Sequence, residues 1–446
     1  MNLREHQIEA IARVRRSMAQ GNRRVVLVIP TGGGKTVIGS AVAKRSVDSG
    51  RRVLFLAHRA ELIDQAARTL TAHGLTVGAL CASATTPPNP YAMVQVASVQ
   101  TLLARNERPP ADLILADECH HFGDAAEQWI ALLGDYGSAY VLGLTATPER
   151  GDGSGLSGSF DSLVVGATLA ELTNLGFLVP CEVMRPDHPL KPGELAQSPV
   201  DAYVEHATGR RALVFARSVP LAEEYAESFN TRGITARMLC ADTPWAERQM
   251  YLDAFRRGAV QVLVNVYVLT EGFDDPGVSC CIIARGCGSA GMYLQMIGRV
   301  LRPAPGKTKA VVLDLRGVSH EHGLPTDERE YSLHGQGIRL RDPNAYCPVC
   351  GMPRRPPAPC AGCGYAPSGD DATKPDTVVG VSLKPYQAAC ANDDVEMRAV
   401  RLARWMSDAR RRGFKDGWWR AKFNAVYGAR ASALIIAKAR ELAGAA

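Results

Sequence analysis

The chain has 446 residues, of which 46% are hydrophobic and 22% charged, values that are ordinary for folded domains, and its length allows two to four of them. No apolar run approaches the ~18–20 residues that cross a bilayer, and the charged N-terminus MNLREHQIEA lacks the apolar segment of a signal peptide. These features exclude the membrane classes and predict a cytoplasmic protein whose twelve cysteines stay reduced or bind metal.

The positive charge gathers near the C-terminus. The formal net charge is +6, but residues 396–446 hold twelve Lys or Arg and four Asp or Glu, a local charge of +8. The other 395 residues therefore sum to −2. A basic excess confined to one end of a chain is typical of an arm or helix that binds nucleic acid.

Apolar runs alternate with amphipathic segments from residue 24 to residue 144. The predicted strands are Val25–Ile29, Val53–Ala57, Met93–Ala97, Leu113–Ala116 and Tyr140–Leu144, and the segments between them include Val37–Val47, Ala60–His73 and Ala125–Gly134. This alternation predicts an α/β fold in which a parallel sheet carries helices on both faces.

A second alternation follows residues 185–200, which carry four prolines and are predicted to be a linker. Its predicted elements are the strands Ala212–Ala216, Val260–Val266, Cys280–Ala284 and Ala310–Leu315 and the helices Pro220–Arg232 and Met292–Leu301. The sequence therefore predicts two α/β units of similar size. After them we expect a small metal module at residues 341–370 and a basic helical tail at residues 371–446.

A glycine-rich turn, Pro30-Thr31-Gly32-Gly33-Gly34-Lys35-Thr36, joins the first strand to the first helix. Glycines let backbone N–H groups approach phosphates, and the helix N-terminus adds partial positive charge. In such a loop Lys35 reaches the β- and γ-phosphates of a nucleoside triphosphate, and the Thr36 hydroxyl holds Mg²⁺. The general pattern asks for Gly where this chain has Ile29, so an ordinary turn with a chance Lys-Thr pair is the alternative.

Two acidic residues, Asp117 and Glu118, directly follow a predicted strand. A carboxylate at the carboxyl end of a parallel strand, beside a phosphate loop, can hold Mg²⁺, and the next one can orient or deprotonate the attacking water. We assign Asp117 to the metal and Glu118 to the water. Without the phosphate loop, the same pair would be read as a solvated loop.

Eight segments occur in the order found in superfamily 2 helicases and together cover nearly all of residues 1–316. They are Leu3-Arg4-Glu5-His6-Gln7, Pro30–Thr36, Ala57-His58-Arg59-Ala60-Glu61-Leu62, Ala97-Ser98-Val99-Gln100-Thr101-Leu102, Asp117–His120, Thr145-Ala146-Thr147-Pro148, Thr270-Glu271-Gly272-Phe273-Asp274 and Gln295–Arg302. The chain therefore resembles that superfamily, whose phosphate loop tolerates Ile29, with Cys119 where the DEAH box has Ala.

This resemblance implies two tandem RecA-like domains, at residues 1–184 and 201–340, that bind ATP and Mg²⁺ between them. It also implies site residues beyond those already derived. Gln7 would read the adenine, and Gly272 and Asp274 would lie at the nucleotide. The residues implied to contact nucleic acid are Arg59, Gln100, Thr101 and Thr270.

The stretches Thr147–Gly153, Phe160-Asp161 and Leu172–Pro180 resemble those of XPB-like and RadD-like bacterial and phage helicases. Because those relatives act on DNA, the resemblance implies DNA as the partner, either single-stranded or as a branched duplex.

Two arginines of the last segment suit the role of arginine fingers. Arg299 and Arg302 are spaced i, i+3, so on a helix both guanidinium groups point to the same side. Across an interdomain cleft they would stabilise charge on the γ-phosphate, an effect typically worth ~10³–10⁵ in rate. Gln295, one turn earlier, would reach the phosphates or the water. The alternative is a surface helix with local salt bridges, which does not explain Gly298 within it.

Four cysteines, Cys347, Cys350, Cys360 and Cys363, form a CxxC-x₉-CxxC array in which each pair is followed by Gly. Two such knuckles complete a tetrahedral Zn²⁺ site that has no open position and is therefore structural. Disulfides are the alternative, disfavoured in the cytosol. The other eight cysteines are scattered and are expected to be small core residues.

The tail combines basic and aromatic side chains. Arg410, Arg411 and Arg412 form a run that suits contact with phosphates, and Trp405, Trp418 and Trp419 are interleaved with basic residues. Packing against the motor is the alternative for the tryptophans, and for them it is favoured.

The sequence thus predicts an ATP-dependent DNA helicase or translocase. Three alternatives stay open: a double-strand DNA translocase that does not separate strands, an RNA helicase, and a nucleic-acid-binding adaptor with little turnover. The complete set of Lys35, Asp117, Glu118 and both arginines argues against the adaptor.

Overall fold

The computed structural model describes residues 3–335 and 376–385, together with a few positions nearer the C-terminus. Within the first range it leaves out residues 58–59, 82–85, 124–125, 150–154, 189, 192, 271, 328 and 330. Beyond residue 385 it describes residues 402–403, 405–406, 410, 419, 436 and 439–440. The four cysteines of the predicted zinc module lie outside the described residues.

The first domain contains a sheet of seven described strands in the order β3-β4-β2-β5-β6-β1-β7, and all their pairings are parallel. The strands are β1 (Arg24–Val28), β2 (Val53–Leu56), β3 (Val77–Leu80), β4 (Val94–Ala97), β5 (Leu113–Asp117), β6 (Tyr140–Thr145) and β7 (Ser162–Val165). The helices are α1 (Glu5–Ala19), α2 (Lys35–Asp48), α3 (Ala60–Ala72), α4 (Val99–Arg105) and α5 (Ala126–Asp135). The α/β order predicted for residues 24–144 is confirmed.

The strands of this sheet are buried on both faces. In β1, Val25 and Leu27 pack in one apolar cluster with α1, α2 and α3, whereas Val26 and Val28 pack in another with α4 and α5. Successive side chains of a strand point to opposite faces, so an unbroken apolar run is what a sheet between two helical layers requires.

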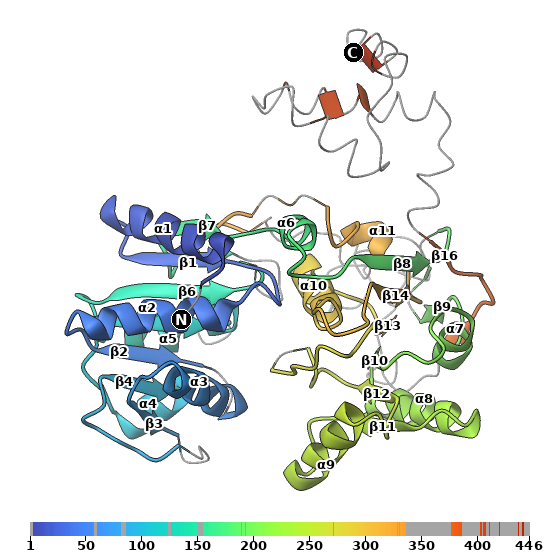
Figure 1. Cartoon of the computed structure of the whole chain (residues 1–446), viewed down its shortest axis with the longest axis horizontal. Coiled ribbons are helices and arrows are strands. Elements are labelled where there is room, and N and C mark those ends of the chain that lie inside the picture. The colour runs from blue at the N-terminus through green and yellow to red at the C-terminus, as the bar shows by residue number, and fades with distance from the viewer. Residues whose placement is uncertain are drawn as a thin grey trace, which may run out of the picture.

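The second domain repeats this plan with the strand order β11-β12-β10-β13-β14-β8-β16, parallel except for the antiparallel β16–β8 pair. The strands are β8 (Cys181–Arg185), β10 (Ala212–Ala216), β11 (Ala236–Leu239), β12 (Val262–Asn265), β13 (Cys280–Ala284), β14 (Ala310–Asp314) and β16 (Lys384–Pro385). The helices are α6 (Leu169–Asn174), α7 (Pro199–His206), α8 (Val219–Thr231), α9 (Trp245–Arg256), α10 (Ala290–Gly298) and α11 (Ser319–His322). Figure 1 shows the two sheets side by side, with α6 and α10 between them.

The structure moves the predicted domain boundaries. β8 was assigned to the first domain and the linker, yet it pairs with β14 of the second sheet. Residues 376–385 were assigned to the tail, yet β15 (Thr377–Val378) pairs with β9 (Glu194–Leu195) and β16 pairs with β8. The side chain of Asp376, which is 2% exposed, anchors this return because it accepts hydrogen bonds from Arg217 Nε at 2.9 Å and Tyr225 Oη at 2.6 Å. Pairings between strands so far apart in the chain cannot be predicted from the residues around either strand.

Residues 324–327, 329 and 331–335, here called the strap, connect the second domain back to the first. Leu324 packs against the core of the second domain, whereas Tyr331 and Leu333 pack against the first. The Leu333 carbonyl accepts hydrogen bonds from the backbone N–H groups of Leu156, at 2.6 Å, and Ser157, at 2.9 Å. The strap is therefore a second physical connection between the domains, besides the chain that passes through α6.

Gly155→Ala is expected to detach the strap and lower the melting temperature, at a cost of about 1–3 kcal/mol. A Cβ at Gly155 would lie 2.0 Å from the Leu333 carbonyl oxygen and 2.2 Å from the Gly335 nitrogen, and neither backbone atom can yield without moving the strap. The measurement is thermal unfolding. Gly158→Ala, whose Cβ would meet nothing within 4 Å, is the control in the same loop. Equal melting temperatures for the two variants would refute the close contact.

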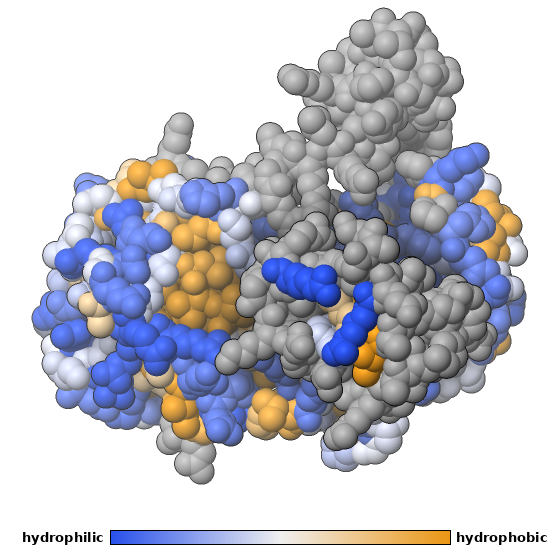
Figure 2. All heavy atoms as spheres, turned by 90° about the horizontal axis from the view of Figure 1, so that it is seen from above, coloured by the Kyte–Doolittle hydropathy of each residue, from blue (hydrophilic) through white to orange (hydrophobic). Residues whose placement is uncertain are grey.

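Seen from above, the first domain presents an apolar area framed by hydrophilic side chains (Figure 2), on the side where α1 and β7 lie in Figure 1. The four residues of β7, which ends the sheet, are each partly exposed.

In the part of the chain that the structure describes, no helix combines the length and apolar character that a membrane crossing needs.

Candidate nucleotide site

A cleft of about 610 Å³ opens where the two domains face each other. From the first domain it is lined by Arg4, Gln7, Thr31, Gly32, Gly34, Lys35, Thr36, Asp117 and Glu118, among others, and from the second by Gly272, Phe273, Asp274, Arg299 and Arg302. The structure thus brings together nearly all the residues that the sequence analysis assigned to ATP and Mg²⁺. It does so because the phosphate loop and the acidic pair both follow parallel strands, whose carboxyl ends meet at one edge of the sheet.

The phosphate loop is shaped by close contacts that only glycine permits. Gly34 is the N-cap of α2 and has a φ of 89°, in the left-handed region. A Cβ there would lie 2.3 Å from Gln7 Nε2. Gln7 in turn donates to the Gly33 carbonyl at 3.4 Å. The buried Thr31 hydroxyl has no hydrogen-bond partner among the described residues, a polar atom that a bound phosphate oxygen could satisfy.

Gln7 is held beside the loop by its own helix terminus. Its Oε1 accepts a hydrogen bond of 3.0 Å from the Arg4 backbone N–H. The Arg4 guanidinium lies 4.3 Å from the centre of the Phe177 ring, a cation–π contact. Sequence reasoning did not single out Arg4 or Phe177 as functional. Arg4 and Phe177 are far apart in the sequence, so their contact could be seen only in the folded structure.

Glu118 sits at a bend directly after β5. Its φ is 46°, in the left-handed region that a residue with a Cβ rarely adopts. Its backbone N–H donates to Asp117 Oδ1 at 3.1 Å, and Lys35 Nζ lies 2.5 Å from its Oε1. Strained backbone of this kind persists where the surroundings enforce it, commonly at active sites. The bend places the Glu118 carboxylate beside the ammonium group of Lys35.

The residues around Asp117 suit Mg²⁺. The Asp117 carboxylate and the Thr36 hydroxyl line the same cleft and supply the hard oxygen ligands that this cation prefers. The remaining positions would be filled by water and phosphate oxygens, as is usual for Mg²⁺.

Cys119, the departure from the DEAH box, is a core side chain. It is buried, and a Cβ on Gly143 would lie 2.8 Å from its sulfur, so the strand and the thiol are in close contact. Burial, reinforced by the neighbouring Glu118 and Asp117, raises the pKa of the Cys119 thiol well above its usual value. The thiol therefore stays protonated and takes no part in the chemistry.

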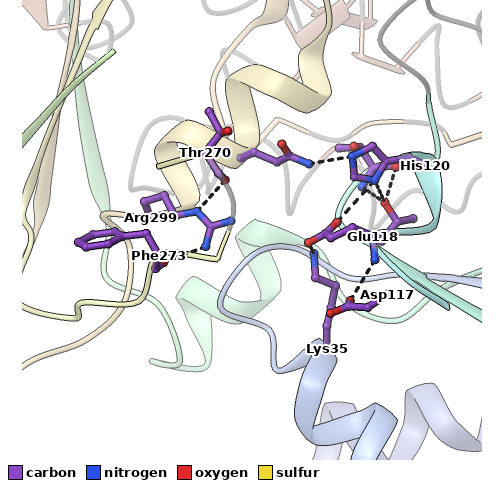
Figure 3. A network of polar contacts seen from close by, with 10 residues as sticks. Lys35, Asp117, Glu118, His120, Thr270, Phe273 and Arg299 are labelled. Carbon is purple, nitrogen blue, oxygen red and sulfur yellow. Dashed lines mark hydrogen bonds and ion pairs between the residues drawn. The ribbon is translucent and has the colours of Figure 1, made fainter. Parts of the chain in front are cut away.

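His120 connects the acidic pair to the second domain. One ring nitrogen, Nδ1, lies 2.9 Å from Thr145 Oγ1 and 3.5 Å from Glu118 Oε2. The other, Nε2, lies 3.4 Å from Gln295 Nε2 of α10. Figure 3 shows the resulting line of side chains from Lys35 through Glu118 and His120 to the second domain. Gln295 was predicted to reach the phosphates or the attacking water; in the structure it contacts His120, two residues after Glu118.

The helix that carries Gln295 is shorter than predicted. α10 ends at Gly298, with Arg299 as its C-cap, so Arg302 lies outside the helix and the argument from i, i+3 spacing is wrong. Two glycines allow this helix to pack closely on the first domain: a Cβ on Gly298 would lie 2.7 Å from Thr31 Cβ, and one on Gly291 would lie 2.7 Å from Thr147 Oγ1. α10 therefore lies directly against the phosphate loop and the Thr145–Pro148 segment.

Both arginines line the cleft but make different contacts. The buried Arg299 donates to the Thr270 carbonyl from Nε, at 2.9 Å, and to the Phe273 carbonyl from Nη1, at 3.0 Å (Figure 3). Arg302 forms an ion pair with Asp274, and burial lowers the pKa of its guanidinium. Its Cγ lies 3.8 Å from where a Cβ on Gly32 would be, so it lies against the phosphate loop.

The residues predicted to contact nucleic acid have mixed surroundings. Gln100 is exposed on α4, and Thr101 Oγ1 accepts a hydrogen bond of 2.8 Å from Ser98. Thr270 is buried and donates to the Tyr267 carbonyl at 3.0 Å. Arg410 is exposed. Arg59, Arg411 and Arg412 lie outside the described residues.

Two family models match the chain. The model described as "Type III restriction enzyme, res subunit" matches residues 1–150, and the model described as "Helicase conserved C-terminal domain" matches residues 196–304. They fall on the first and second domain respectively, and the cleft lies between the regions that they match.

Relatives and solved structures agree with these models. A 51.5 kDa protein of a Lactococcus phage is 32% identical over 327 residues, 69% of each chain. A Schizosaccharomyces pombe protein named as the mitochondrial ATP-dependent helicase irc3 is 31% identical over 395 residues, 77% of this chain and 64% of its own. A solved fragment described as an HsdR subunit of a type I restriction enzyme from Vibrio vulnificus shares the fold, with a TM-score of 0.57 at 21% identity over 75% of this chain and 67% of that one. With both family models in place, the chain belongs to the superfamily 2 helicases, which are nucleic-acid-dependent ATPases.

Proposed function

We propose that the protein is an ATP-dependent DNA helicase or translocase, in which hydrolysis between the domains drives movement along DNA. The observation that carries this proposal is the composition of the cleft. Lys35, Asp117 and Glu118 enter it from the first domain and Arg299 and Arg302 from the second, so one nucleotide would touch both. A site divided in this way couples the state of the nucleotide to the relative position of the domains.

ATP binding would rearrange the ion pair of Lys35. The ammonium group lies 2.5 Å from Glu118, and both side chains are largely buried. The phosphates of ATP compete for Lys35 as a more highly charged partner, which releases Glu118 to accept a proton from the attacking water. Mg²⁺ held by Asp117 and Thr36 would neutralise phosphate charge.

A movement of the Glu118 side chain would affect the second domain through His120, which contacts both. Its ring lies between Glu118 and Gln295, so a shift of the carboxylate on ATP binding alters a contact that crosses the cleft. Gly298 and Gly291 let α10 follow the first domain closely. Because α10 packs on the first domain and also contacts His120, the two domains are suited to switch between two discrete relative positions.

DNA is favoured over RNA because two of the matches are described as restriction enzymes, a class of enzymes that act on DNA. They are the family model on residues 1–150 and the V. vulnificus structure. The test is ATP hydrolysis with single-stranded DNA, duplex DNA and RNA, followed by strand displacement from a tailed duplex. Stimulation by single-stranded DNA together with displacement supports the proposal. Stimulation by duplex without displacement identifies a double-strand translocase, preference for RNA an RNA helicase, and absence of turnover an adaptor.

We further propose a structural Zn²⁺ bound by Cys347, Cys350, Cys360 and Cys363, in a cytoplasmic setting that keeps the four thiols reduced. The support is their spacing in the sequence. Protein purified without chelator should contain one Zn²⁺ per chain, by metal analysis, and the quadruple Cys→Ser variant should contain none. Zinc-free parent protein would refute the site. Chelation should leave the two motor domains folded, because each has its own core.

The basic tail is proposed to hold DNA phosphates, with Arg410, Arg411 and Arg412 as its centre. Its support is the local charge of +8 in residues 396–446. Contacts of this kind release counterions and make binding depend steeply on salt. For the tryptophans packing against the protein is favoured instead, and the burial of Trp419, which is 2% exposed, supports this for that residue.

A further inference from the structure

Tyr267 has an unusual backbone conformation for its residue type. Among the described residues three non-glycine positions have a positive φ: Asn106, Glu118 and Tyr267. Asn106 is a helix C-cap, where a left-handed residue is common. Glu118 belongs to the nucleotide site. Tyr267, with a φ of 60°, is a bulky residue for which this region is a genuine outlier. Such strain persists only where the surroundings enforce it.

The loop of Tyr267 is fixed by side chains on both sides. The Thr270 hydroxyl donates to the Tyr267 carbonyl at 3.0 Å. The buried Asn265 accepts from the Leu269 backbone N–H at 3.2 Å and donates to the Val214 carbonyl of β10 at 2.9 Å. These bonds fix the backbone of the loop, so little backbone freedom is left to lose when a ligand binds to the Tyr267 side chain.

The ring lies on a buried cation. Arg285 is 5% exposed, and its guanidinium lies 3.6 Å from the centre of the Tyr267 ring. Its Nε donates to the Gly286 carbonyl at 3.2 Å, whereas its Nη1 has no acceptor among the described residues. Yet Tyr267 remains 48% exposed, because the guanidinium covers only one side of it. A flat ring supported by an arginine and open on its other side is the kind of surface on which a nucleobase stacks.

The position also suits nucleic acid. Tyr267 follows β12 and Arg285 follows β13, at the carboxyl edge of the second sheet. The exposed Gln100, on the helix that follows β4, lies at the corresponding edge of the first sheet. The same loop leads to the nucleotide cleft, since the Thr270 that holds Tyr267 gives its own carbonyl to Arg299.

We propose that Tyr267, supported by Arg285, is a stacking platform for one base of the bound strand. This proposal rests on the nucleic-acid-binding function proposed above and adds the residue that contacts a base. Stacking on aromatic side chains tolerates any base, as a motor that moves along a strand requires. The chain from Tyr267 through Thr270 to Arg299 then connects the bound base to the ATP site.

Tyr267→Gly separates stacking from strain, because glycine accepts the positive φ but has no ring. We expect it to bind a fluorescent oligothymidylate about 5- to 100-fold more weakly than the parent, by anisotropy. Its melting temperature should stay within about 3 °C of the parent's, because relief of strain offsets the lost ring contact. Tyr267→Asn, which also tolerates this backbone region, should lose the same affinity if Tyr267→Gly folds poorly. Tyr267→Phe keeps the ring and should bind like the parent.

Two controls make the assignment specific. Tyr91→Gly removes a tyrosine that is 94% exposed and precedes β4, so it lies at the amino edge of the first sheet, away from the carboxyl edge proposed to face the strand. This variant should bind oligothymidylate like the parent. On an oligonucleotide of abasic sites, Tyr267→Gly and the parent should bind equally, since no base is present to stack. A parent that does not bind oligothymidylate would overturn the proposed function and the platform together. A parent that binds while Tyr267→Gly binds equally well, or a difference that persists on the abasic strand, would overturn the platform alone.

Discussion

Glu118→Gln is expected to lower the rate of ATP hydrolysis by about 10²–10⁴-fold while ATP remains bound. The substitution removes only the group proposed to accept the proton of the attacking water. In the structure the Glu118 carboxylate also pairs with Lys35 at 2.5 Å. The neutral amide competes less well with the phosphates for that lysine, so ATP affinity should equal or exceed the parent's. Steady-state hydrolysis and the Kd of a fluorescent ATP analogue measure the two effects separately.

Two further variants define this result. Lys35→Ala should weaken ATP binding as well as turnover, because it removes a phosphate ligand from the loop. Glu227→Gln makes the same chemical change on the exposed face of α8 and should leave both unaffected. Normal turnover in Glu118→Gln would remove Glu118 from the catalytic step. A strong loss of ATP affinity in the same variant would show that its pair with Lys35 organises the loop.

The strands could be predicted because their burial is recorded in local sequence. β10 and β13 match the predicted ranges, Ala212–Ala216 and Cys280–Ala284, residue for residue. Strands covered on both faces are continuous apolar runs, and glycine and polar turns bound them. That the candidate nucleotide residues lie together in one cleft was predictable for a related reason, since the phosphate loop and the acidic pair each occupy a contiguous stretch beside a strand.

The contacts between distant segments could not be predicted. β16 joins the second sheet from nearly 200 residues beyond β8, and no periodicity marks such a pairing. α10 ends at Gly298, where it meets Thr31 of the first domain, a contact between domains that the local sequence does not record. Tyr267 stands at a φ that its residue type disfavours, so local propensity argued against the loop that forms. In each case tertiary packing overrides what the neighbouring residues prefer.

Arg299→Ala is expected to lower hydrolysis by about 10³-fold or more at saturating DNA, with a much smaller change in nucleotide affinity. Two losses combine. A positive charge disappears from the cleft, and the carbonyls of Thr270 and Phe273 lose the donor that holds them at 2.9 and 3.0 Å. The loop to which these carbonyls belong also contains Gly272 and Asp274, which line the cleft. Measurement of kcat and KM for ATP, with the Kd of the ATP analogue, separates turnover from binding.

Lysine substitutions distinguish charge from geometry. Arg299 bridges two carbonyls through separate nitrogens, which a single ammonium group cannot reproduce, so Arg299→Lys should be nearly as impaired as Arg299→Ala. Arg302 instead pairs with the single carboxylate of Asp274, a partner that lysine can also satisfy, so Arg302→Lys should retain clearly more activity than Arg302→Ala. If Arg299→Lys recovered most of the rate, charge alone would account for Arg299 and the loop would not depend on its two hydrogen bonds. If both alanine variants lost ATP affinity as steeply as rate, the arginines would be ground-state phosphate ligands, since a residue that acts in the transition state changes kcat first.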